Sequence, residues 1–103
     1  MRFYVSGCRG AVSETIIKWK EEKGYEIVMG AYCLKGSVLS ESEIAGINMR
    51  LIEICDGIYM VRGWESDNIA VAELAFAKAT GKKVHFESRQ YNILKSLDKG
   101  GSE

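Results

Sequence analysis

The sequence predicts a small α/β domain with a parallel sheet of about four strands, in the order 2-1-3-4, and helices on both faces of the sheet. Two observations lead to this fold class. Short apolar runs alternate with longer segments whose apolar residues recur every three or four positions, as strand–helix–strand units do. The chain has 103 residues, enough for one hydrophobic core, so we expect one domain over residues 1–103.

Four short apolar runs predict the strands. Each is rich in β-branched or aromatic residues and is bounded by glycine or charged residues. Because a helical segment or a long loop with a helix separates each run from the next, consecutive strands are expected to run parallel through right-handed crossovers. The result is a doubly wound, flavodoxin-like three-layer sandwich. The predicted strands are residues 2–6, 25–30, 57–61 and 83–87.

Three helices are predicted between the strands, with glycine stops after them, and residues 91–97 could add a short final helix. Ser40 and Glu43 have the spacing of a capping box at the start of the second helix. Residues 99–103 are expected to be a disordered tail. The apolar faces expected to be buried are Ile16, Ile17 and Trp19 in the first helix and Ile44, Ile47, Leu51 and Ile54 in the second.

The composition excludes several classes of partner. Lys+Arg and Asp+Glu balance at 14 each, so no electrostatic attraction favours a nucleic acid polymer or a membrane surface. No apolar run approaches the roughly 18 residues of a membrane helix. The start MRFYVSG enters a strand without a leader, so we expect a cytoplasmic protein. Three cysteines without C-x-x-C spacing and a lone histidine argue against a disulfide framework or a metal site, and we expect no cofactor.

Ligands of a doubly wound sheet bind beyond the carboxyl ends of its strands, where the strand order reverses. This rule selects three loops: Gly7–Gly10, residues 30–40 and Arg62–Asp67. Backbone N–H groups in the first loop, together with the guanidinium of Arg9, suit an anion, but a glycine-rich turn after a strand is also simply a turn. Trp64 in the third loop could stack on a base or a sugar, or plug the edge of the core.

The helix predicted over Asp67–Thr80 carries a carboxylate on its apolar side. No lysine or arginine lies three or four positions from Glu73, where it could form an ion pair along the helix. Burying an ionised carboxylate is costly, so either its pKa rises or it finds partners elsewhere in the fold. One explanation is an ion pair with Arg9 or Arg62. The other is a nucleophile or base held by a tyrosine hydroxyl. At about 100° per residue, Glu73 lies on the same side of the helix as Ile69, Ala70, Phe76, Ala77 and Thr80.

Taken together, these residues resemble the nucleoside 2-deoxyribosyltransferase superfamily. The resemblance spans about residues 2–85 and rests on FYVSG-CRG near the start, on CDGIYMVRGWES, and on the D-x5-E spacing of Asp67 and Glu73. The chain most resembles the small phage and bacterial members with a G-W-E-x-S-like loop. It is also similar to the 2'-deoxynucleoside 5'-phosphate N-hydrolases.

The resemblance implies cleavage or transfer of the N-glycosidic bond of a (deoxy)nucleoside or nucleoside monophosphate. Glu73 matches the nucleophile that attacks the anomeric carbon and forms a glycosyl-enzyme, which water or a second base resolves. Tyr4 matches the tyrosine that orients the nucleophile, and Asp67 matches the residue that holds the 5' end of the sugar. The family usually assembles its site across a subunit interface, so we expect a homodimer or higher homo-oligomer. The remaining substrate-binding positions are Gly7, Cys8, Arg9, Gly10, Gly63 and Trp64.

Two departures from the family pattern affect the expected chemistry. Asn48 stands eight residues before Asp56, where the family usually has the aspartate that protonates the leaving base. An amide cannot deliver that proton, and general acid catalysis typically contributes about 10²–10⁴ in rate, so activity is weak, absent or served by another acid such as Glu65. Asp67 favours a substrate with a free 5'-OH, whereas Arg9 favours a 5'-phosphate.

Three functions remain open from the sequence. The first is an N-glycosidic enzyme with Glu73 as nucleophile. The second is a protein on the same scaffold that binds a nucleotide or nucleotide-like ligand without cleaving it, which Asn48 favours. The third is a structural or interaction protein with a vestigial pocket. Glu73 argues against the third, because a buried carboxylate without a role costs stability.

Overall fold

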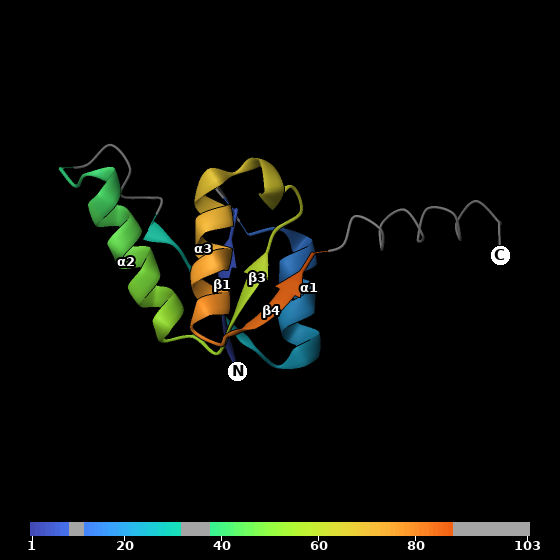
Figure 1. Ribbon diagram of the computed structural model, residues 1–103. Coiled ribbons are helices and arrows are strands. Elements are labelled where there is room, and N and C mark those ends of the chain that lie inside the picture. Colours follow the sequence, from blue (N-terminus) through green and yellow to red (C-terminus); the bar gives the residue numbers. More distant parts are fainter. Residues whose placement is uncertain (9–11, 32–37, 88–103) are drawn as a thin grey trace.

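The computed structural model describes residues 1–8, 12–31 and 38–87, and it confirms the predicted fold class (Figure 1). The four strands are all parallel and lie in the predicted order, β2-β1-β3-β4. Among these residues no helix is both long and apolar enough to cross a bilayer. The helix predicted over 91–97 and the tail lie outside the described residues. The strands are β1 (Arg2–Ser6), β2 (Glu26–Met29), β3 (Gly57–Met60) and β4 (Lys83–Phe86).

Among the described residues, three helices and the 3-10 turn η2 (Trp64–Ser66) lie between the strands. Helix α1 (Glu14–Lys23) packs on one face of the sheet, and α2 (Glu41–Glu53) and α3 (Asn68–Ala79) pack on the other (Figure 1). The turn η2 joins β3 to α3. The predicted capping box at Ser40 and Glu43 is confirmed, with each side chain hydrogen-bonded to the other residue's backbone N–H.

The strands divide their side chains between two cores. Because successive side chains of a strand point to opposite faces, Val5 and Tyr59 pack with Ile16 of α1. Tyr4, Ile58 and Met60 point the other way, toward α2 and α3. Ser6 is two residues after Tyr4 and therefore faces the same layer, which places two hydroxyls of β1 under α3.

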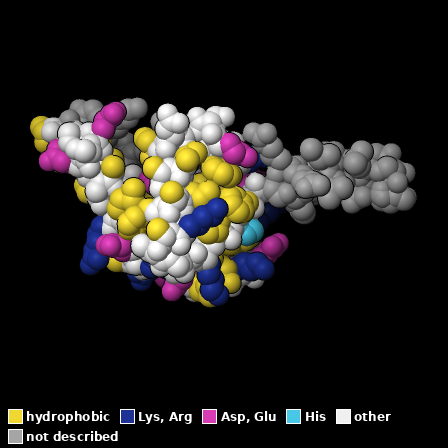
Figure 2. Space-filling view, in the orientation of Figure 1, with side chains coloured by type: hydrophobic (Ala, Val, Ile, Leu, Met, Phe, Trp, Pro, Cys, Tyr) yellow, Lys and Arg dark blue, Asp and Glu magenta, His cyan; other side chains and the backbone are white. Residues whose placement is uncertain are grey.

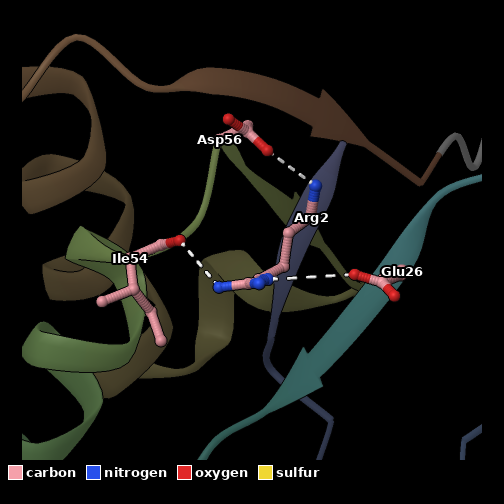
Figure 3. Close-up of polar contacts among 4 residues, drawn as sticks. All are labelled: Arg2, Glu26, Ile54 and Asp56. Carbon is pink, nitrogen blue, oxygen red and sulfur yellow. Dashed lines mark hydrogen bonds and ion pairs between the residues drawn. The ribbon is translucent and has the colours of Figure 1, made fainter.

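The amino-terminal edge of the sheet is fixed by Arg2 (Figure 3). Its backbone N–H donates to Asp56 Oδ2 at 2.8 Å, and its guanidinium donates to the carbonyl of Ile54 at 3.3 Å, just after α2. A long ion pair of 4.0 Å also links it to Glu26 of β2, which at exposed positions contributes little energy. Lys82 Nζ donates to the carbonyl of Glu53 and satisfies another free carbonyl at the end of α2.

The expected buried face of α2 is wrong in part. Ile47 and Ile54 are 37% and 45% exposed, whereas Asn48 and Ile52 are the fully buried residues of this segment. The physical reason is a hydrogen bond of 2.7 Å, in which the backbone N–H of Ala31 donates to Asn48 Oδ1. This contact turns the helix so that a polar side chain faces the sheet.

The buried faces of α1 and α3 are also rotated slightly about the helix axis relative to the predicted buried faces. In α1, Ile16 is buried and Trp19 half-buried as expected, but Ile17 is exposed. In α3, Ile69 and Thr80 are exposed. The buried line of α3 is Ala70, Glu73, Leu74 and Ala77.

Candidate functional site

Glu73 is buried beneath α3 and is held by two hydroxyls from β1. Its side chain is 1% exposed. The hydroxyl of Tyr4 donates to Oε2 at 2.8 Å, and the hydroxyl of Ser6 donates to Oε1 at 2.6 Å. Both carboxylate oxygens are therefore fixed by short hydrogen bonds that suit an ionised acceptor. The predicted pairing of Tyr4 with Glu73 is present in the structure.

Ser6 is a site residue that the sequence analysis missed. It is fully buried at the last position of β1. The signal was its spacing, because a residue two positions after Tyr4 in a strand must share its face. A small polar residue in that position of an apolar strand has to find a hydrogen-bond partner, and Glu73 is that partner.

Asp67 fixes the start of α3 and so the position of Glu73. Its Oδ1 accepts hydrogen bonds from the backbone N–H groups of Ile69 and Ala70, at 3.0 and 3.3 Å. This is the N-cap of the helix, where aspartate is strongly preferred. Glu73 lies on the same buried line as Ala70, less than one turn further along. Asp67, which is expected to hold the sugar, therefore also caps the N-terminus of α3.

The first and third loops meet at the carboxyl end of β1 and β3. Gly7 has φ of +92°, and a Cβ built there would lie 3.6–3.8 Å from side-chain carbons of Val61, Trp64 and Ala70. Ser6 of β1 is in register with Met60 of β3, the two strands between which the order reverses. Glu73, Gly7 and Trp64 therefore surround the position where doubly wound sheets bind ligands.

Trp64 is half-buried beside Phe86 of β4, with ring centroids 5.6 Å apart. It packs against the core under α3, at the edge of the site. Gly63, which precedes it, has φ of +94° and starts the 3-10 turn. This backbone conformation favours glycine, so Gly63 directs Trp64 onto the core edge.

The remaining predicted residues are distributed as follows. Asn48 lies at the carboxyl end of β2, where its Oδ1 binds the Ala31 N–H, on the same face of the sheet as Glu73. Cys8 is half-buried, and its side chain packs against the core on the α1 side. Arg9 and Gly10 lie outside the described residues. Arg62 is exposed, and its backbone N–H donates to Glu87.

A second tyrosine–carboxylate pair lies on the opposite face of the sheet. The Tyr59 hydroxyl donates to Glu87 Oε2 at 2.8 Å. Burial raises the pKa of Tyr59, and the hydrogen bond and charge of Glu87 raise it further. His85 stacks on Tyr59 and packs against Trp19 with its ring tilted, and burial lowers its pKa. In the described part of the chain, no group of three His, Cys, Asp or Glu residues is arranged to hold a metal ion.

One comparison with known proteins gave a match. The model of the family described as "Domain of unknown function (DUF4406)" matches residues 1–86. The chain belongs to the DUF4406 family. The DUF4406 match covers every strand and helix described above and ends with β4. No curated protein and no solved structure matches the chain.

Proposed function

We propose that this protein cleaves or transfers the N-glycosidic bond of a (deoxy)nucleoside or nucleoside monophosphate, with Glu73 as nucleophile. The observation that carries the proposal is the buried Glu73 carboxylate with its two hydroxyl partners, Tyr4 and Ser6. Burying a carboxylate lowers the stability of the folded protein, even with two hydroxyl partners. A catalytic role for Glu73 would explain why the chain keeps it there. The resemblance described above supplies the reaction class.

The proposed reaction has two steps. An oxygen of Glu73 attacks the anomeric carbon of the sugar and forms an ester bond, while the bond to the base breaks and its electron pair stays on the base nitrogen. The departing base takes a proton from water or an acidic side chain. Water, or the nitrogen of a second base, then attacks the same carbon, gives up a proton to the solvent, and breaks the ester bond so that the Glu73 carboxylate is released. Tyr4 and Ser6 would orient the carboxylate during both steps.

The substrate is placed by residues around Glu73. Trp64 would form one wall for the base, because its half-buried ring stands at the carboxyl edge of the sheet. Asp67, at the N-terminus of α3, would contact the 5' hydroxyl of the sugar. We also propose that the protein is cytoplasmic and that it is a homo-oligomer. Sedimentation of the full chain at tens of micromolar tests the oligomeric state.

The deciding experiment measures free base released from a panel of deoxynucleosides and deoxynucleoside 5'-monophosphates. The chain offers a matched control, because Tyr4–Glu73 and Tyr59–Glu87 are similar pairs on opposite faces of the sheet. Glu73→Gln should abolish release and Tyr4→Phe should reduce it, by about 10–100-fold. Tyr59→Phe, which removes the hydroxyl of the second pair and keeps both charges of β4, should leave it unchanged. Release that survives in Glu73→Gln, or no release from any compound, contradicts the proposal.

A second candidate function is binding of a nucleotide or nucleotide-like ligand without cleavage. Asn48 favours it, because an amide replaces the expected acid and its Oδ1 already binds the Ala31 N–H. In that case no base is released, but one class of nucleotide raises the melting temperature of the protein. Glu73→Gln should then retain that thermal shift.

A further inference from the structure

Strand β4 leaves one of its edges unpaired among the described residues. It is the last strand in the sheet order, next to β3 only. Lys83 N–H donates to the carbonyl of Asp56, and Glu87 N–H donates to the carbonyl of Met60, so these residues point their backbone groups toward β3. Because backbone groups alternate in direction along a strand, those of Val84 and Phe86 point to the open edge.

The open edge carries apolar surface. Phe86 is 45% exposed although it lies in the sheet, and Trp64 is beside it. Figure 2 shows hydrophobic side chains gathered beside α3, on the side where β3 and β4 lie. An unpaired strand edge with exposed apolar side chains is a template for pairing with another strand.

We propose that β4 pairs antiparallel with β4 of a second copy of this chain, about a two-fold axis at His85. In this register Val84 lies opposite Phe86 of the second copy. These are the residues whose N–H and C=O groups point outward, so each Val84–Phe86 pair exchanges both of its hydrogen bonds. The exposed Phe86 ring would pack beside Val84 of the other chain, and the two sheets would become one.

Charge complementarity selects this register. Lys83 and Glu87 are two residues on either side of His85, so Lys83 of one chain lies opposite Glu87 of the other, twice in the dimer. Opposite charges directly across an antiparallel pair stabilise it, and like charges weaken it. A register shifted by two residues would instead place Lys83 opposite His85 and Glu87 opposite Gly81, which loses both charge pairs.

The Glu87 carboxylate is held by two hydrogen bonds from its own chain, both from the β3 side of β4. Its Oε2 accepts from Tyr59, and its Oε1 accepts from the backbone N–H of Arg62 at 2.9 Å. A carboxylate fixed in this way loses little conformational freedom when a lysine of the second copy approaches it. The remaining lone pairs of both oxygens can accept from Lys83.

The other edge strand, β2, lacks this self-complementarity. Glu26 N–H donates to the carbonyl of Met1, so Ile27 and Met29 point their backbone groups outward. The equivalent antiparallel pairing about Val28 would place Glu26 opposite Gly30, without a basic partner. The pairing surface is therefore assigned to β4. This inference does not depend on the proposed reaction.

The test is sedimentation of the full chain at tens of micromolar, with folding of each variant checked by circular dichroism and thermal melting. The unchanged protein should be a dimer. Lys83→Glu places like charges opposite each other and should raise the dimer dissociation constant about tenfold or more. Glu87→Lys should do the same. A mixture of the two variants restores opposite charges and should dimerise again.

A backbone variant makes the test independent of charge. Val84→Pro removes an outward N–H that β3 does not use, and proline is tolerated at such edge positions. It should leave a folded monomer. The control is Ile47→Gln on the exposed side of α2, which should remain a dimer. A monomeric unchanged protein overturns the proposal. So does a dimer that survives Val84→Pro and both charge reversals, or one that is lost only in Ile47→Gln.

Discussion

The hydroxyl of Ser6 lies 2.6 Å from Oε1 of Glu73, at the last residue of the central strand β1. Tyr4, two residues earlier, binds the other oxygen of the same carboxylate. One strand thus fixes both oxygens of a side chain that comes from a helix 67 residues further along the chain. The contact links the packing of α3 on the sheet to the orientation of the proposed nucleophile.

Ser6→Ala should lower both stability and activity. The substitution leaves Oε1 of a buried carboxylate without the serine donor, so the free energy of unfolding should fall by about 1–3 kcal/mol. Base release should fall mainly through kcat, because the hydroxyl orients Glu73 rather than the substrate. Chemical denaturation and steady-state kinetics measure the two effects. Thr15→Ala, at an exposed position on α1, is the control, and an unchanged kcat in Ser6→Ala would remove Ser6 from the site.

Asn48→Asp should increase the rate of base release. The new side chain keeps an oxygen for the Ala31 N–H, and it adds a group that can carry a proton to the leaving base. The rate should rise by at most about 10²–10⁴-fold. This increase should become smaller as pH rises above the pKa of the new carboxyl group, because only its protonated form can donate. A pH–rate profile of both proteins measures this. If the rate is equal at every pH, Asn48 does not face the leaving base.

His85 should make the protein less stable in mild acid. Burial lowers its pKa, the charge of Lys23 lowers it further, and Glu87 opposes both. The unfolded chain, with a histidine pKa of about 6.5, then binds the proton more readily than the folded one. Stability is therefore lost as pH falls from about 6.5 toward the lower folded pKa.

Denaturant titrations at several pH values check this, and His85→Phe should flatten the curve in that window. The pKa of Glu43 is also lowered, by its hydrogen bond from the Ser40 N–H, but its contribution is lost only as pH falls below its ordinary value of 4.5. The pH range in which His85 affects stability is therefore separate from that of Glu43. A slope near pH 6 that persists in His85→Phe would assign the effect to another group.

Gly57→Ala should destabilise the sheet. A Cβ at this position would lie 2.9 Å from the carbonyl oxygen of Lys83 and would overlap the ring of Phe3. The ring can shift but the β4 backbone cannot easily do so, because Lys83 N–H is bonded to the carbonyl of Asp56. The expected loss is about 1–3 kcal/mol in the free energy of unfolding. Gly46→Ala, in open space on α2, should be neutral or stabilising by comparison.

The fold could be predicted because it depends on local patterns. Alternating apolar runs and helical periodicity define the units, and the crossover rule orders them. The same pattern placed Glu73 on the buried side of α3, and the family resemblance selected Tyr4 as its partner. The two-residue period of a strand places Ser6 on the same face as Tyr4, but its contact with Glu73 joins residues distant in sequence, which no periodicity records. The Tyr59–Glu87 pair was missed for the same reason.

The buried face of α2 shows where periodicity fails. The isoleucines at positions 47 and 54 fit the apolar stripe, yet the helix buries Asn48 instead. The cause is the backbone N–H of Ala31, which lies two residues beyond the end of β2 and needs an acceptor once it is buried. That requirement arises only in the folded chain.

Arg2 and its partners hold together the end of the sheet that lies opposite the candidate site. Arg2, Asp56 and Lys82 tie together β1, the end of α2 and the entries to β3 and β4 at the edge remote from Glu73. Substitutions among the loops at the carboxyl edge leave those ties intact. The loops at the carboxyl edge are therefore the positions to randomise in a directed-evolution library, because substitutions there do not touch the contacts that fix the opposite end of the sheet.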